Sequence, residues 1–201
     1  ELPVLSAASP LSDTDWLLPF FGFNSNTKER YTEADGTEVI TEVETDRSLH
    51  IQPDGSIVYR SGTEATPEIS AQEQNPTAAE SALGCSILLQ ELTEGLTGEA
   101  SLYLQSVSQS GDSTQLRFGY QLAGTPIRFS DGGSAAEITL SGTSITRLTL
   151  RFRQYSTTNE QSLLLPLRQT LAIAADHPGV ELSVGYADGG GDTVSASWLA
   201  D

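Results

Sequence analysis

Few side chains in this sequence are of the types that perform catalysis or bind metal ions. It contains two histidines, His50 and His177, and one cysteine, Cys85. A nucleophilic triad needs a histidine that accepts a proton from serine or cysteine, and a zinc site needs three or four close ligands. His50 lies on the polar side of an alternating strand pattern, and His177 precedes a proline at a helix end. We therefore expect no catalytic residue, no metal site and no cofactor, and we expect Cys85 to be buried and unreactive in an apolar helix face.

The loop from Asp188 to Asp192 is the segment that most resembles an ion-binding site. Its two aspartates flank three glycines, but it lacks the alternating oxygen ligands and the final acid of a calcium loop. A hairpin tip is the favoured interpretation. The 27 acidic residues leave carboxylate-based glycoside hydrolysis open without supporting it, because the spatial separation of two carboxylates decides that chemistry.

Arginines gather on one predicted strand. Residues 145–154 alternate, with Leu148, Leu150 and Phe152 on one side and arginines on the other. One hypothesis is a docking surface for an acidic partner or a carboxylate-rich ligand. The favoured alternative is a solvated sheet face whose arginines pair with acids on a neighbouring strand. The candidate interaction surface consists of Arg117, Arg147, Arg151 and Arg153.

The charge of the chain excludes several classes of partner. Ten basic and 27 acidic residues give a net charge of -17, which repels phosphate backbones, so we expect no nucleic acid partner. Anionic membrane surfaces are disfavoured for the same reason. No apolar run approaches the roughly 20 residues of a membrane-spanning helix. We therefore expect membrane contact only through an N-terminal anchor outside this sequence.

The sequence begins at Glu1 and contains no methionine. This indicates a removed N-terminal segment, either a membrane anchor or a cleaved signal peptide, and the alternative is a boundary set for other reasons. A single cysteine forms no intramolecular disulfide, which is ordinary for surface proteins of Gram-positive bacteria. We expect an extracytoplasmic chain that is anchored to the cell membrane through the removed segment.

Hydrophobic periodicity predicts an α+β fold of antiparallel sheets with two main flanking helices. Residues 29–60 form a β-meander with two Asp-Gly turns. A helix begins at Asn75 as N-cap, with Cys85 on its buried face. A second helix spans about 166–176, with Leu167, Leu171 and Ala174 buried. The expected units are 1–15, a tether or irregular leading segment; 16–62, an N-terminal β-meander unit; 63–75, a linker; and 76–201, a C-terminal α+β unit with two helices.

Two stretches of the chain are alike. Each has a tyrosine, a Gly-Thr pair at Gly36 or Gly124, an apolar strand and a hairpin with glycine at its tip. A tandem repeat of meander–helix units is one interpretation, and unrelated hairpins with common turn residues are the other. The sequence leaves open whether the two meanders form one sheet or two.

One of these stretches also resembles a known family. The run from Phe118 to Ile127, followed by a glycine-tipped hairpin and an arginine-bearing strand, resembles the G-x-P-I core of bacterial YycH and YycI proteins. The likeness extends over about residues 77–199. A proline-containing approach to the tryptophan is replaced here by residues 195–197, and the usual basic character is absent. The family-like positions are Tyr120, Gly124, Pro126, Ile127, Gly185, Tyr186 and Trp198.

The resemblance implies a function by contact. Members of that family have one N-terminal transmembrane helix and repeated α+β units outside the cytoplasm, and they restrain the sensor histidine kinase of a cell-wall two-component system. We therefore expect a non-enzymatic regulatory domain whose partner is a membrane protein, either such a kinase or a sister regulator, in an oligomeric state that the sequence leaves open. The alternative is a surface ligand-binding module with a cleft for a peptide or a cell-wall fragment.

Overall fold

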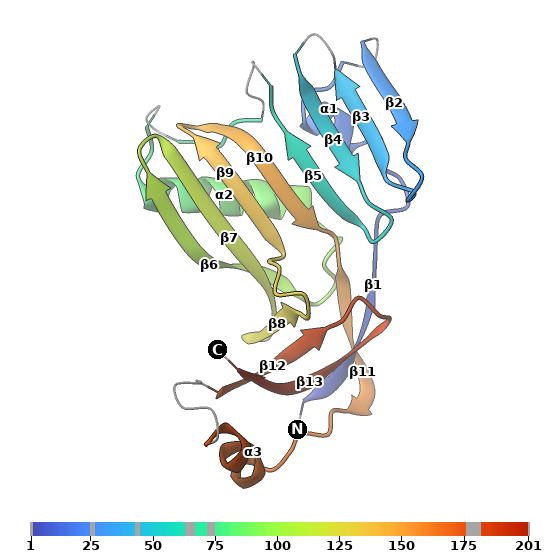
Figure 1. Ribbon diagram of the computed structural model, residues 1–201, viewed down its shortest axis with the longest axis vertical. Helices are drawn as coiled ribbons and strands as arrows, with labels where there is room; N and C mark the ends of the chain where they lie inside the picture. Colours follow the sequence, from blue (N-terminus) through green and yellow to red (C-terminus); the bar gives the residue numbers. More distant parts are fainter. Residues whose placement is uncertain are drawn as a thin grey trace.

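Strands dominate the architecture in the computed structural model of the chain (Figure 1). The structure describes residues 2–24, 27–42, 45–62, 67–71, 75–175 and 182–200. The helices there are α1 (Leu17–Phe20), α2 (Ala78–Leu92) and α3 (Leu167–Ala174). The strands are β1 (Pro3–Ala8), β2 (Lys28–Thr32), β3 (Glu38–Glu42), β4 (Arg47–Ile51), β5 (Ser56–Arg60), β6 (Ser101–Ser110), β7 (Ser113–Leu122), β8 (Thr125–Phe129), β9 (Ala136–Ser141), β10 (Ser144–Arg151), β11 (Gln154–Gln161), β12 (Leu182–Asp188) and β13 (Thr193–Ala200).

These strands form one large sheet, which makes the fold richer in strand than the predicted α+β layout. The order is β11-β1-β13-β12-β8-β7-β9-β10-β5-β4-β3-β2, and β6 pairs with β7 outside this path. All pairings are antiparallel except that of β12 with β8. Strand β5 pairs with β10, so the two predicted meanders are joined edge to edge. The tandem repeat stays a prediction.

Glycines fix the turns of the first meander. Gly36 and Gly55 have φ angles of 87° and 85°, a region that is costly for residues with a Cβ atom. The Asp54 carboxylate accepts a hydrogen bond from the Ser56 N–H at 2.8 Å, which closes the second turn. Both Asp-Gly turn predictions are confirmed.

Helix α2 packs on one face of the sheet and closes the larger core (Figure 1). Its N-cap is Thr77, not the predicted Asn75. The Thr77 hydroxyl accepts a hydrogen bond from the Glu80 N–H, and the Glu80 carboxylate accepts one from the Thr77 N–H. This reciprocal capping box satisfies two backbone donors at the helix start. Burial of Cys85, Leu89 and Leu92 confirms the predicted helix face.

The predicted linker 63–75 belongs to the folded body over residues 67–71, which are described together with Asn75. Ile69 is buried, and its N–H donates to the Thr143 carbonyl at 2.9 Å. A Cβ atom on Gly84 of α2 would lie 3.0 Å from the Ile69 Cβ. The helix therefore has a glycine where this segment crosses it.

A smaller core forms at the other end of the sheet, and the predicted tether 1–15 contributes to it. Strand β1 pairs with β11 on one side and with β13 on the other. Leu5 and Ala7 of β1 are buried against Tyr155 and Tyr186. Because burial of one leucine contributes about 1.5–3 kcal/mol, this segment is part of the fold and the tether prediction is wrong.

Helix α3 exposes the side that the sequence pattern predicted to be buried. Leu167 and Leu171 are 54% and 52% exposed, whereas Thr170 is 6% exposed. The Thr170 hydroxyl donates to the Pro166 carbonyl one turn earlier, which satisfies its polar group on burial. Helical periodicity shows which residues share a face, but not which face packs.

Among the described residues, no helix has the length and apolar character needed to span a bilayer.

A buried ion pair joins the two cores. Strand β10 ends at Arg151, and the chain turns inward so that Phe152 enters the larger core and Tyr155 the smaller one. Between them, Arg153 donates from Nε and Nη2 to the two carboxylate oxygens of Asp188, each at 2.9 Å. The Tyr155 hydroxyl donates to the same carboxylate at 2.7 Å. Burial, followed by the Asp188 charge, raises the pKa of Tyr155, so this hydroxyl stays protonated and donates.

We predict that Asp188→Asn lowers the free energy of unfolding by about 3 kcal/mol, because it leaves Arg153 buried without its counter-charge. Urea denaturation monitored by circular dichroism measures this change. The control is Asp131→Asn, which breaks the pair of Arg151 with a carboxylate whose side chain is 59% exposed; its effect should stay within about 1 kcal/mol. Equal effects of the two substitutions would contradict a structural role for the buried pair.

Candidate functional site

The arginines of the candidate interaction surface do not all share one surface. Arg117 of β7 lies opposite Glu137 of β9, with 3.4 Å between the charged groups. Arg147 of β10 is exposed and lies opposite Arg60 of β5. Arg117 and Arg147 occupy the sheet face opposite α2, because their strand neighbours are buried in the larger core. Arg117 and Arg147 of the candidate interaction surface therefore lie on a solvated sheet face.

The other two arginines of the candidate interaction surface, Arg151 and Arg153, pair with aspartates of the same chain. Arg151 donates to the Asp131 carboxylate at 2.8 Å, and its guanidinium lies 4.5 Å from the centre of the Phe129 ring. Arg153 was expected on the same exposed face but is buried against Asp188. The strand ends before Arg153, so the two-residue alternation no longer applies to it.

Most of the family-like positions lie where β7, β8 and β12 run side by side, and Trp198 lies on the next strand, β13. Tyr120 of β7 lies opposite Ile127 of β8, which in turn neighbours Tyr186 of β12. A Cβ atom on Gly185 would lie 2.8 Å from the Pro126 carbonyl oxygen, so only glycine fits this close strand approach. Gly124 forms the β7–β8 turn with φ of 83°, and the Trp198 indole donates to the Leu165 carbonyl at 2.9 Å. These contacts explain how the strands pack at this point.

Cys85 and His50 lie on different elements, α2 and β4. Cys85 is fully buried, and burial raises the pKa of its thiol to about 12, which suppresses the reactive thiolate. His50 lies between Val39 and Val58 on the neighbouring strands. His177 lies outside the described residues. In the described part of the chain, no group of three or more metal-ligand side chains forms.

A cavity of about 640 Å³ lies at the junction of the two cores. Its lining combines the β4–β5 turn, the end of β8, the β10–β11 connection and the loop after β12. Two arginines face it, and both already pair with aspartates. The Asp188 carboxylate accepts hydrogen bonds from Arg153, Tyr155 and the Gly190 N–H, so this first aspartate of the loop is already bound by donors of the protein.

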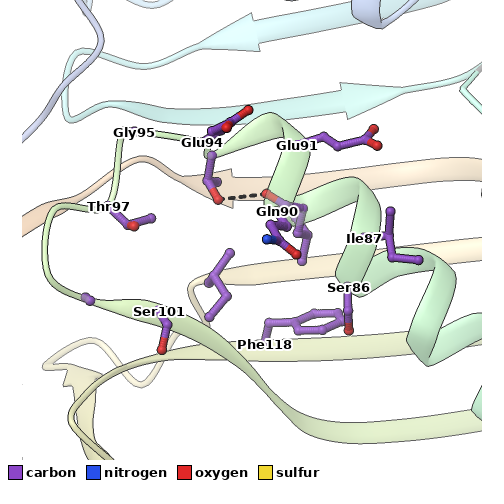
Figure 2. A pocket seen from close by; sticks show the side chains of 13 residues that line it. Ser86, Ile87, Gln90, Glu91, Glu94, Gly95, Thr97, Ser101 and Phe118 are labelled. Carbon is purple, nitrogen blue, oxygen red and sulfur yellow. Dashed lines mark hydrogen bonds between the residues drawn. The ribbon is translucent and has the colours of Figure 1, made fainter.

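A larger groove of about 730 Å³ lies between the C-terminal half of α2 and strand β6. Its apolar floor includes Leu102 of β6 and Phe118 of β7, and Ile87 of α2 is 44% exposed at its side. Polar side chains of α2 and of the following loop complete the lining. Figure 2 shows Ser86 and Gln90 directed from α2 into the hollow and Ser101 and Phe118 on the strand side, whereas Glu91 and Glu94 lie farther from these strands, with the Glu91 carboxylate directed outward.

Strand β6 is an edge strand without the usual protection of an edge. Of the strands that the structure describes, only β7 pairs with it, and its ten residues include no charge and no proline. Sheet edges normally carry charges, prolines or a covering loop that prevent pairing with other chains. A bulge at Gln105 divides this edge, and the segment from Ser101 to Leu104 lies beside the groove.

The other two edges of the sheet are protected. Strand β2 has five residues and begins with three charged side chains. The outer edge of β11 is covered by a loop, because the Glu99 N–H donates to the Tyr155 carbonyl and the Tyr155 N–H donates to the Thr97 carbonyl. The Glu99 carboxylate also accepts the Thr157 N–H at 3.3 Å. Strand β6 differs from β2 and β11 because its edge has neither charged side chains nor a covering loop among the described residues.

The ladder of β7 shows which groups of β6 point outward. The Phe118 carbonyl accepts the Ala135 N–H, so Phe118 faces β9 and its neighbour Gly119 faces β6. Tyr103 lies opposite Gly119 and therefore bonds to β7. It follows that Leu102 and Leu104 direct their N–H and C=O groups to the open edge. In the described residues no backbone group bonds to them there.

The fold and groove define a strand-rich α+β domain with one open sheet edge. No family model matches the chain, and no curated protein matches it. Among solved structures the chain is similar to the C-terminal domain of YpeB from Bacillus megaterium, with 11% identity and a TM-score of 0.43, covering 98% of this chain and 88% of that one. The resemblance to YycH and YycI proteins stays a hypothesis.

We predict that, in the free protein, the amides of Leu102 and Leu104 exchange with solvent about 100-fold faster than that of Tyr103, because only Tyr103 bonds to β7. Hydrogen exchange followed residue by residue by NMR measures these rates. The amide of Thr157, held by Glu99 at the β11 edge, is the matched control and should exchange more slowly than the two leucines. Uniform protection across residues 102–104 would contradict an open edge.

Proposed function

We propose that this chain is a contact domain that binds an extended segment of a partner protein by strand addition to β6. The observation that carries the proposal is the unpaired backbone of Leu102 and Leu104 beside a groove of about 730 Å³. In strand addition, main-chain hydrogen bonds hold the ligand, and every second side chain enters a neighbouring pocket. The groove under α2 is placed to receive those side chains.

The partner that the family resemblance implies is a membrane protein. We extend the proposal to a YycH/YycI-like role, in which an extracytoplasmic domain with an N-terminal membrane anchor modulates a sensor histidine kinase or binds a sister regulator. The residues that carry the resemblance support this, since Tyr120, Ile127 and Tyr186 occupy neighbouring positions in the sheet. An extended kinase segment held on β6 would be restrained in one conformation.

A second candidate is the surface ligand-binding module, and the junction cavity favours it. This cavity of about 640 Å³ lies between the two cores, and Arg151 and Gly189 are among the residues in its wall. A peptide carboxylate or an acidic cell-wall fragment would replace Asp131 as the partner of the Arg151 guanidinium. The two hypotheses differ in the residues that respond to binding, which are the β6 edge in one case and the glycine loop in the other.

We predict that the extracytoplasmic domain of a cell-wall sensor kinase binds this chain with micromolar affinity and slows amide exchange at Leu102 and Leu104. Leu104→Pro should weaken binding at least about tenfold, because proline removes an outward N–H while an edge strand tolerates it. Isothermal titration and NMR hydrogen exchange measure the two effects.

Leu104→Ala is the matched control for the proline variant. It loses the same side chain but keeps the N–H, so its affinity should change less than that of Leu104→Pro, with circular dichroism confirming that both fold. Equal loss in the two variants would exclude backbone pairing at this position. Protection of Gly189 and Gly190 in place of the leucines would favour the ligand-binding module, and no binding at micromolar concentration would contradict the kinase as partner.

A further inference from the structure

The groove lies in the part of the chain that carries no positive charge. Residues 61–116 include α2 and β6 and contain no lysine, arginine or histidine. The same stretch contains eight acidic residues: Glu64, Glu68, Glu73, Glu80, Glu91, Glu94, Glu99 and Asp112. This stretch of sequence therefore carries a net charge of -8, and the nearest arginine beside β6 is Arg117 of β7, which lies opposite Ser106.

Two of these carboxylates are available at the groove. Glu80 caps α2, and Glu99 holds Thr157. Glu91 and Glu94 line the groove and have no ion-pair partner in the described part of the chain. They sit in and just after the last turn of α2, which has no basic residue. The negative end of the helix dipole adds to their charge.

The shape of the groove suits long basic side chains. Its floor of Leu102 and Phe118 is apolar, its middle is polar, and its acids, Glu91 and Glu94, lie farther from the strands (Figure 2). Arginine and lysine side chains place an aliphatic stem on apolar surface and keep the charged head near water or a carboxylate. A short side chain would leave part of the apolar floor uncovered. An acidic side chain would be repelled by the carboxylates of Glu91 and Glu94.

We propose that the groove beside β6 receives an extended protein segment that carries arginine or lysine at alternate positions. The inference rests on the proposed strand addition and specifies its partner. Side chains at every second position of an added strand face α2. Their stems lie over Leu102 and Phe118, and their cationic heads meet Glu91 and Glu94. The intervening residues of the partner face the opposite side of the sheet and carry no charge requirement.

Three synthetic peptides of ten residues test the charge requirement. Each alternates threonine or valine with one variable residue, which is arginine, glutamine or glutamate. Fluorescence anisotropy at about 50 and 200 mM salt gives the affinities, and NMR hydrogen exchange reports the amides of Leu102 and Leu104. The arginine peptide should bind about tenfold more tightly than the glutamine peptide at low salt, this ratio should fall at high salt, and the glutamate peptide should not bind.

A double variant separates the groove from the overall charge of the chain. Glu91→Gln with Glu94→Gln should abolish the preference for arginine while the glutamine peptide binds as before. The control is Glu29→Gln with Glu160→Gln, which removes the same charge from exposed positions on β2 and β11. If the two double variants lose the preference equally, the attraction is not local and the proposal is overturned.

The remaining outcomes distinguish this proposal from the strand addition on which it rests. If arginine and glutamine peptides bind equally and both protect Leu102 and Leu104, the charge requirement is wrong and strand addition stands. If the arginine peptide binds without protecting these amides, the groove is not its site. If no peptide protects them, strand addition itself is contradicted.

Discussion

Strand β7 is the element on which both halves of the sheet depend. It pairs with β6 along one edge, and with β9 and then β8 along the other. Its first half places Leu116 and Phe118 in the larger core, and its second half places Tyr120 and Leu122 in the smaller core. Because both edges of β7 are occupied, β6 becomes the outermost strand at this point. The open edge therefore follows from the use of one strand by two cores.

The pairing of arginines within the chain affects the electrostatic field around the open edge of β6. In the part of the chain that the structure describes, several arginines pair with carboxylates, among them Arg30, Arg47, Arg117, Arg151 and Arg153. The field outside is then set by the remaining acids, and it extends about 10 Å at 0.1 M salt. A cationic segment is attracted over this distance, whereas backbone bonds to β6 form only on contact. Charge thus governs the approach of a partner, and the strand edge governs how it is held.

Local features of the fold were predictable from sequence, and those that depend on distant pairing were not. The Asp-Gly turns and the buried face of α2 follow from neighbouring residues. Strand β1 pairs with a strand about 150 residues away, and nothing in its short sequence signals that partner. Arg153 was misplaced because alternation carries through a strand but not past its end. The buried face of α2 was recognised, yet the groove beside it requires knowledge of which strand lies at the edge of the sheet. The signal available in the sequence was a strand of ten residues without charge or proline.

The strength of backbone pairing limits what the β6 edge achieves alone. Leu102 and Leu104 offer two donors and two acceptors, and each hydrogen bond contributes a net of about 0.5–1.5 kcal/mol. Four such bonds supply about 2–6 kcal/mol, while micromolar affinity requires about 8 kcal/mol after the entropic cost of association. Side chains in the groove must therefore supply the remainder. Backbone hydrogen bonds do not depend on the side chains of the partner, so the groove determines which partner segment binds. Because neither the hydrogen bonds nor the groove contacts alone supply the full affinity, the contact remains reversible.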